Sequence, residues 1–201
     1  MIIKRVVAGI YGANCYLVKD EVSGKGFVID PGGDVDDILK GLNQIHMNVE
    51  YILLTHGHLD HTTGAAELQE AVGGKIAISS EDDKLIMSGV KLYGPLLSNG
   101  ADMHIASGDV IEVGEMKIEC IATPGHTPGC ISFRVGDVVF TGDTLFYRSI
   151  GRTDLDGGNS ALIEKSIKEK LYTLPEDTIV YPGHGTATTI KDEKRENSFV
   201  R

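Results

Sequence analysis

The sequence predicts an α/β fold, a four-layer αββα sandwich in which two β-sheets pack face to face and helices lie outside them. The first observation is that strands followed by a helix occur in both halves of the 201-residue chain. The second is that neither sheet alone could keep its apolar face from water, so sheet-on-sheet packing is the natural arrangement. The length is ordinary for one hydrophobic core, so we expect residues 1–201 to form a single domain.

The first half of the chain begins with strand-like segments and then acquires helical periodicity. Strands are predicted at residues 2–8, 14–19, 26–29, 51–54 and 75–79. Helices are predicted at residues 35–45, 63–72 and 81–87. Asp34 is positioned to cap the first helix, and the continuously apolar run 51–54 is typical of a fully buried strand.

The second half repeats the plan after a stretch that is hard to interpret. Residues 88–106 have weak periodicity, and their role is not predicted. Strands follow at residues 110–113, 116–122, 130–135, 138–140 and 179–181, with a helix at 162–171. The basic cluster from Lys191 to Arg195 is interrupted by two acidic residues, which favours a solvated terminal segment.

The composition excludes several classes of partner. The formal net charge is −10, and an acidic surface repels phosphate backbones, so no nucleic acid is expected. No stretch reaches ~18 apolar residues, so no membrane segment is expected. Three widely spaced cysteines without a C-x-x-C motif favour buried thiols in a reducing compartment, and hence a cytoplasmic location. The oligomeric state is not predicted.

A cluster of metal-binding residue types directly follows the strand at 51–54. In His56-Gly57-His58-Leu59-Asp60-His61, the alternation of an extended chain places His56, His58 and Asp60 on one side, and a turn can bring His61 alongside. Imidazole and carboxylate are the usual ligands of Zn²⁺ and also suit iron and manganese. The alternative is a polar loop before the next helix, but such a loop seldom needs three imidazoles.

Three more polar residues each follow a predicted strand. His126 lies in a loop held by prolines and glycines, Asp143 follows the strand at 138–140, and His184 follows the last strand. If these strand ends share one rim of the sandwich, all three side chains can converge on the first cluster. Seven candidate ligands result, whereas His46 and His104 occupy ordinary surface contexts and are interpreted as non-ligands.

The order of these residues resembles the metallo-β-lactamase superfamily over essentially the whole chain. The segments 123–127, 140–146 and 181–185 are similar to its glyoxalase II-like (hydroxyacylglutathione hydrolase) branch. The resemblance implies two metal ions, with zinc expected first and iron or manganese as alternatives. It implies the following ligands: His56, His58 and His126 for one ion, Asp60, His61 and His184 for the other, and Asp143 bridging both.

Such a centre implies the hydrolysis of a small-molecule thioester. Two divalent ions roughly 3.5–4 Å apart can share a water and lower its pKa toward ~7, which provides hydroxide to attack the thioester carbonyl. Asp60 is expected to orient that hydroxide as well as to bind metal. A thiolate leaving group needs little protonation, so the lack of an obvious dedicated acid suits a thioester.

Two departures from the larger glyoxalase II proteins concern the substrate. Those proteins have a C-terminal helical extension that this chain lacks, and a lysine and a tyrosine where this chain has Arg152 and Asp154. Arg152 could still bind a carboxylate, and Tyr147 or Arg148 could line the mouth. The alternative is a surface loop in which Arg148 or Arg152 pairs with Asp154.

Other activities remain to be distinguished. The segment 151–154 also resembles the persulfide dioxygenase branch, which would bind one iron through His56, His126 and Asp143. A non-enzymatic metal-binding module is a remote alternative, because a ligand set that leaves positions for water is a poor structural site. The flavodiiron branch has a glutamate in place of His58, β-lactamases are normally exported, and RNA processing does not suit the acidic charge.

Overall fold

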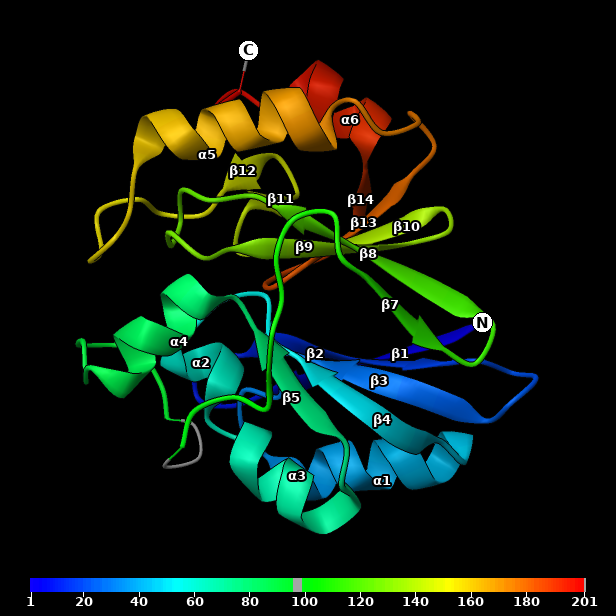
Figure 1. The fold of residues 1–201 in the computed structure, drawn as a ribbon. Coiled ribbons are helices and arrows are strands. Elements are labelled where there is room, and N and C mark those ends of the chain that lie inside the picture. Colours follow the sequence, from blue (N-terminus) through cyan, green and yellow to red (C-terminus); the bar gives the residue numbers. More distant parts are fainter. Residues whose placement is uncertain (96–98, 201) are drawn as a thin grey trace.

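Two six-stranded sheets lie face to face, and helices cover the outer face of each (Figure 1). The computed structural model describes residues 1–95 and 99–200. This arrangement confirms the four-layer αββα sandwich. Part of the stretch for which no structure was predicted, residues 96–98, lies outside the described residues.

The first sheet has the strand order β1-β2-β3-β4-β5-β6. Its strands are β1 (Ile2–Ala8), β2 (Ala13–Lys19), β3 (Lys25–Ile29), β4 (Asn48–Leu53), β5 (Lys75–Ile78) and β6 (Met103–His104). The first three strands pair antiparallel and the others pair parallel. The helices on this side are α1 (Val35–Ile45), α2 (Leu59–Thr62), α3 (Ala65–Val72) and α4 (Ser80–Met87). Parallel pairing places the carboxyl ends of β3, β4 and β5 at one edge.

The second sheet has the order β14-β13-β10-β9-β8-β7. Its strands are β7 (Val110–Val113), β8 (Met116–Ala122), β9 (Ile131–Val135), β10 (Val138–Gly142), β13 (Ile179–Pro182) and β14 (Thr188–Thr189). A small hairpin, β11 (Leu145–Phe146) and β12 (Ser149–Ile150), follows β10. The outer helices are α5 (Ser160–Ser166), which continues as a π-helical turn η1 (Ile167–Leu171), and α6 (Ile190–Glu196). Because β10 and β13 are parallel, their carboxyl ends also share an edge.

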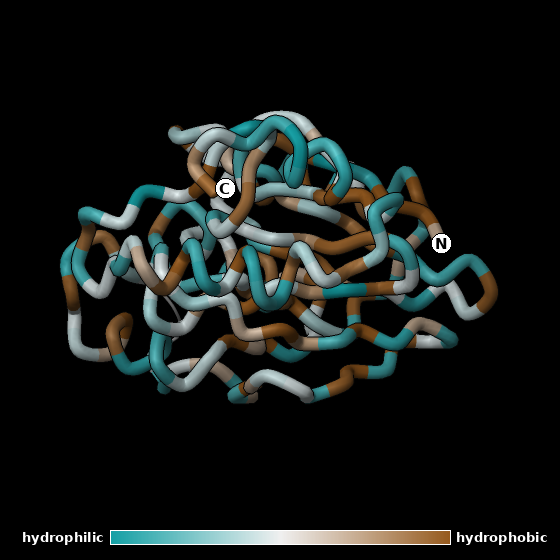
Figure 2. Tube along the Cα trace, turned by 90° about the horizontal axis from the view of Figure 1, so that it is seen from above, coloured by the Kyte–Doolittle hydropathy of each residue, from teal (hydrophilic) through white to brown (hydrophobic). Residues whose placement is uncertain are grey.

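Apolar residues fill the layer between the sheets and the layers under the helices. Phe27, Phe133 and Phe140 are fully buried between the sheets, where the Phe140 ring stacks on Tyr181 with centroids 5.3 Å apart. Val28 points to the opposite face and packs under the helices of the first half. In Figure 2, hydrophobic (brown) and hydrophilic (teal) residues alternate along the trace. All three cysteines are free and buried.

Three details of the sequence analysis need correction. Asp34 precedes α1, but its carboxylate does not cap the helix; it accepts a hydrogen bond from the Gly9 amide at 2.9 Å. The segment from Lys191 to Arg195 is part of α6, and its basic residues are exposed as predicted, but the segment is not solvated throughout. Glu193 within it is fully buried, because its carboxylate accepts hydrogen bonds from the Arg148 amide and the Thr188 hydroxyl. The run at 51–54 is not buried throughout, since Tyr51 is half-buried.

Among the described residues, no helix is long and apolar enough to cross a membrane.

Candidate metal centre

All seven predicted ligands meet at the edge where the strands of both sheets end. His56, His58, Asp60 and His61 follow β4, His126 follows β8, Asp143 follows β10 and His184 follows β13. The backbone leaves the extended conformation earlier than predicted, because residues 59–62 form the short helix α2. That helical turn brings Asp60 and His61 to the same side as His184.

The first group consists of His56, His58 and His126, and all three are buried. Nδ1 of His58 lies 2.9 Å from Nε2 of His126. The His56 ring lies edge-on to both, with centroids 4.9 Å from His58 and 4.8 Å from His126. Three imidazoles this close in the protein interior would repel one another if protonated, so the group favours neutral, ligand-ready rings.

The second group consists of Asp60, His61 and His184. Nε2 of His61 lies 3.3 Å from Nε2 of His184, and Oδ2 of Asp60 lies 3.3 Å from the same His184 nitrogen. His61 is fully buried, whereas the His184 side chain is 29% exposed and faces the outside. The group is therefore open on the His184 side.

Asp143 lies between the two groups. Its Oδ1 is 3.4 Å from His61 Nε2, and its Oδ2 is 3.6 Å from His126 Nε2. The same Oδ2 lies 3.7 Å from His184 Nε2. One carboxylate thus has an oxygen next to each group, which is the arrangement a bridging ligand requires.

Unpaired polar atoms support the fit of divalent cations. Nε2 of His56 and Oδ1 of Asp143 are buried and have no hydrogen-bond partner within the described residues. Such atoms are costly to bury unless something binds them. In His126 and His61, the ring nitrogen that faces away from the centre has a hydrogen-bond partner. Nδ1 of His126 lies 2.8 Å from the Arg152 carbonyl oxygen, and Nδ1 of His61 lies 3.0 Å from Asp30 Oδ2. These clusters indicate divalent metal binding.

The electrostatics of the groups agree with this geometry. Burial, reinforced by the neighbouring imidazoles, lowers the pKa of His56 well below its usual value and that of His58 to about 4. Burial opposes ionisation of Asp143, but the imidazoles of His61, His126 and His184 outweigh it and hold its pKa low. Burial also disfavours a proton on His61, yet the carboxylates of Asp143 and Asp30 raise its pKa. His56 and His58 are therefore neutral imidazoles, whereas His61 lies among carboxylates that attract positive charge.

Two supporting carboxylates were missed by the sequence analysis. Asp30 follows β3, and its two oxygens accept hydrogen bonds from the Thr55 amide at 2.8 Å and the Thr55 hydroxyl at 2.6 Å. Its position directly after an apolar strand is the same signal that identified Asp143.

Asp82 comes from the first turn of α4 and is fully buried. It accepts hydrogen bonds from the Gly57 amide at 2.8 Å, the Thr127 hydroxyl at 2.7 Å and the Gly129 amide at 2.8 Å. This single side chain joins the loop of His56 and His58 to the loop of His126. An acidic helix start gives no sequence signal for that role.

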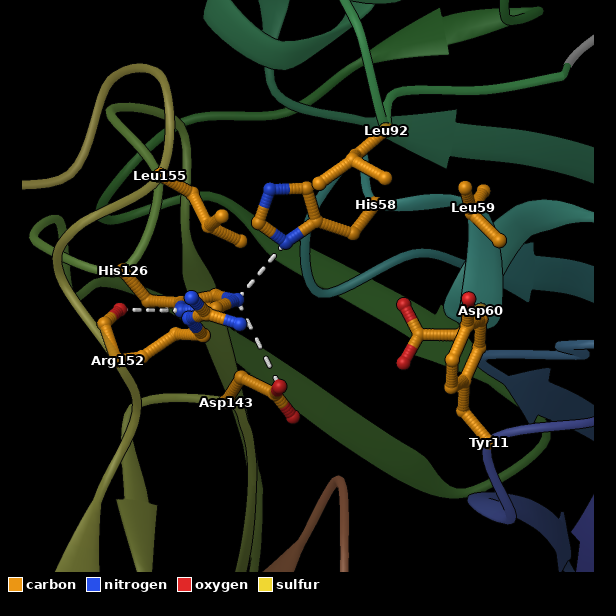
Figure 3. Close-up of a pocket in the computed structure, with 9 residues that line it drawn as sticks. All are labelled: Tyr11, His58, Leu59, Asp60, Leu92, His126, Asp143, Arg152 and Leu155. Carbon is orange, nitrogen blue, oxygen red and sulfur yellow. Dashed lines mark hydrogen bonds and ion pairs between the residues drawn. The ribbon is translucent and has the colours of Figure 1, made fainter.

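A pocket of about 200 Å³ opens beside the centre (Figure 3). It is lined by His58, Asp60, His126 and Asp143 together with Tyr11, Leu59, Leu92, Leu155 and Arg152. Of the three predicted substrate contacts, Arg152 is at this pocket, and its guanidinium bonds Asp154 at 2.8 and 2.7 Å. Tyr147 and Arg148 do not line it; Arg148 lies 5.0 Å from the Tyr147 ring and pairs with Glu196.

The two histidines interpreted as non-ligands lie outside the metal groups of the described residues. His104 has a half-exposed side chain and pairs with Asp83 at 2.7 Å, and His46 ends α1.

The comparisons with known proteins agree with this site. The model of the metallo-beta-lactamase superfamily matches residues 8–184, and the chain belongs to this superfamily. It is 35% identical to the hydroxyacylglutathione hydrolase GloC of Haemophilus influenzae, over 93% of this chain and 92% of that protein. It is also 35% identical to the human mitochondrial persulfide dioxygenase ETHE1, over 90% of this chain and 69% of that protein.

Solved structures show the same likeness. A B3 metallo-beta-lactamase, BLEG-1, superposes with a TM-score of 0.88 at 30% identity and covers 99% of both chains. TTHA1623, solved in a di-iron-bound form, superposes with a TM-score of 0.83 at 31% identity, over 98% of this chain and all of that one. The similarity to a glyoxalase II and to a persulfide dioxygenase is consistent with the glyoxalase II-like branch.

Proposed function

We propose that the protein is a dinuclear metal-dependent thioesterase of the hydroxyacylglutathione hydrolase type, and that its substrate is a small-molecule thioester. The observation that supports this most strongly is the position of Asp143, with one oxygen 3.4 Å from His61 and the other 3.6 Å from His126. A centre for one ion would need only one of the two groups.

The residues of the chain have distinct roles in this proposal. His56, His58 and His126 hold one ion, and Asp60, His61 and His184 hold the other, with Asp143 shared. When bound, two such ions supply a hydroxide nucleophile at neutral pH and polarise the carbonyl of the substrate. Asp60, whose side chain is 20% exposed and whose Oδ2 lies 3.3 Å from His184 Nε2, would orient that nucleophile as well as bind metal.

Imidazole and carboxylate ligands suit zinc, iron and manganese. We propose zinc, because a mixed His/Asp set with open positions is the usual catalytic zinc site. Iron is the alternative, since TTHA1623 was solved with two iron ions.

Persulfide oxidation is the second candidate, supported by the 35% identity to ETHE1. It would use His56, His126 and Asp143 for one iron and leave Asp60 and His184 without a metal. A dinuclear hydrolase uses all of Asp60, His61 and His184 as ligands of its second ion, whereas a dioxygenase with one iron gives this group no ion to bind. A metal-binding module without activity is the remaining alternative.

The test compares the two reactions on the same protein. The chain is stripped with a chelator and reconstituted separately with Zn²⁺ and with Fe²⁺. Hydrolysis of S-lactoylglutathione and of a second thioester is followed, with oxygen uptake on glutathione persulfide and hydrolysis of a penicillin in parallel. Chelator-sensitive thioester hydrolysis supports the proposal. Oxygen uptake by the iron form without thioester hydrolysis would assign the chain to the persulfide dioxygenases. No activity in any of the assays would favour the non-enzymatic metal-binding module.

A further inference from the structure

Apolar side chains from four separate segments surround the mouth of the metal centre. Tyr11 comes from the β1–β2 loop, Leu59 from the start of α2, Leu92 from the loop after α4 and Leu155 from the loop after β12. Figure 3 shows Leu92 and Leu155 on the side of His58 and His126, with Leu59 and Tyr11 on the side of Asp60.

All four side chains are accessible to solvent. Tyr11 is 60% exposed and Leu92 is 37% exposed, while Leu59 and Leu155 are half-buried. Ile10, next to Tyr11 on the same loop, is 91% exposed. Single exposed apolar residues are common, but a convergent set around one pocket marks a surface that a ligand covers.

Fixed positive charge is scarce at this mouth. Among the residues of the described chain that line the pocket, Arg152 carries the only guanidinium, and no lysine is present. Asp154 engages one edge of that guanidinium, because Nε donates to Oδ1 at 2.8 Å and Nη2 donates to Oδ2 at 2.7 Å. The Asp154 carboxylate therefore neutralises the Arg152 charge, and a substrate carboxylate would bind this guanidinium either next to Asp154 or in its place.

From these contacts we infer that the thiol portion of the substrate is uncharged and largely apolar, rather than a dicarboxylate such as glutathione. This inference rests on the thioesterase activity proposed above and names its substrate class. In this inference Leu59, Leu92 and Leu155 contact the thiol portion, and Asp154 is a specificity residue that discriminates against anionic carriers by neutralising the charge of Arg152. The reaction itself is unchanged: water adds at the carbonyl, the C–S bond breaks, and a carboxylate and a free thiol leave.

The first experiment varies only the thiol. The wild-type protein, loaded with zinc, is assayed on three lactoyl thioesters, made with glutathione, with N-acetylcysteamine and with butanethiol. Because the pocket offers apolar contacts and its one guanidinium is neutralised by Asp154, it should favour the butanethiol thioester over the glutathione thioester by about ten-fold or more in kcat/KM. Equal or higher kcat/KM on the glutathione thioester would overturn the inference and leave the thioesterase intact. Hydrolysis of none of the three would overturn the thioesterase proposal itself.

The second experiment separates the apolar contacts from the charge. Leu92→Ala and Leu155→Ala should each lower the ratio of kcat/KM on the butanethiol thioester to kcat/KM on the glutathione thioester several-fold. Val22→Ala is the matched control, because Val22 is 74% exposed in the β2–β3 turn at the opposite end of the sheet from the metal centre. Asp154→Asn frees Arg152 and should lower KM for the glutathione thioester alone. Unchanged substrate preference in all three pocket variants would contradict the inference.

Discussion

Oδ2 of Asp30 lies 3.0 Å from Nδ1 of His61, and both side chains are almost completely buried. The contact directs the other ring nitrogen of His61 toward Asp143 and His184. Asp30 also accepts two hydrogen bonds from Thr55, whose hydroxyl oxygen lies 3.1 Å from Nδ1 of His56. One carboxylate at the end of β3 therefore supports a ligand in each metal group.

Asp30→Asn should weaken metal binding. The asparagine side chain cannot accept hydrogen bonds from the Thr55 amide, the Thr55 hydroxyl and His61 Nδ1 at once, so the His61 ring loses its fixed orientation. Changes of this kind lower metal affinity by about 10–100-fold. A competition titration against a chromophoric chelator measures this. Asp37→Asn, which alters an exposed ion pair with Lys40, is the control. An affinity equal to that of the wild type would show that Asp30 does not position His61.

Loss of a ligand should abolish hydrolysis without unfolding the protein. His58→Ala removes one member of the first group and Asp143→Ala removes the shared carboxylate, so both should lose thioester hydrolysis, by about 10³-fold or more. Circular dichroism checks the fold. His104→Ala is the matched histidine control, because His104 pairs with Asp83 away from the centre. Turnover like that of the wild type in either ligand variant would contradict the dinuclear mechanism.

Metal removal should lower thermal stability as well as activity. An ion that binds only the folded state stabilises it by about 2.7 kcal/mol at a concentration 100 times its Kd. For a chain of this length that corresponds to a rise in Tm of about 5–10 °C. Calorimetry of chelator-treated protein, with and without added Zn²⁺, tests the shift, and His58→Ala should show a smaller one. No shift in the wild type would argue against cation binding at this cluster.

Acid should weaken the hydrogen bonds of Asp20, a residue that follows β2 of the first sheet and bonds the turn between β7 and β8 of the second. The Ser23 hydroxyl and the amides of Val22, Ser23 and Glu115 donate to Asp20, and together they lower its pKa to about 2. Because the folded-state pKa is depressed, this contribution is fully present above the ordinary carboxyl pKa and is lost as pH falls toward 2.

Ser23→Ala should therefore destabilise the protein at neutral pH, with a deficit that shrinks as pH falls from about 4 to 2. Urea unfolding of both proteins at several pH values measures this. Ser88→Ala, at the end of α4, is the control. A deficit that is independent of pH would contradict the assigned role of Asp20.

Much of the metal centre was predictable because its ligands lie in the loops that follow β-strands. His126, Asp143 and His184 each follow a strand of the second sheet, and the sandwich brings those strand ends to the rim that carries His56 and His58. Asp30 also directly follows a strand, β3, but it was not among the predicted site residues.

Other features depend on contacts that local sequence does not encode. Asp82 reaches the histidine loops only because α4 packs beside them. Glu193 reads as a surface charge until its partners Arg148 and Thr188 are in place. The two-residue strands β6, β11, β12 and β14 exist only through pairing with a neighbour, so periodicity cannot reveal them. Sequence patterns therefore located the metal ligands better than the residues that support them.

Metal stoichiometry coupled to turnover tests the central claim most directly. Elemental analysis of purified protein reconstituted with zinc, performed beside the S-lactoylglutathione and butanethiol thioester assays, counts ions per chain and relates them to hydrolysis. The geometry around Asp143 predicts two ions per chain, with hydrolysis lost on chelation and regained on reconstitution. A single bound ion in a protein that consumes oxygen on a persulfide and hydrolyses no thioester would contradict it.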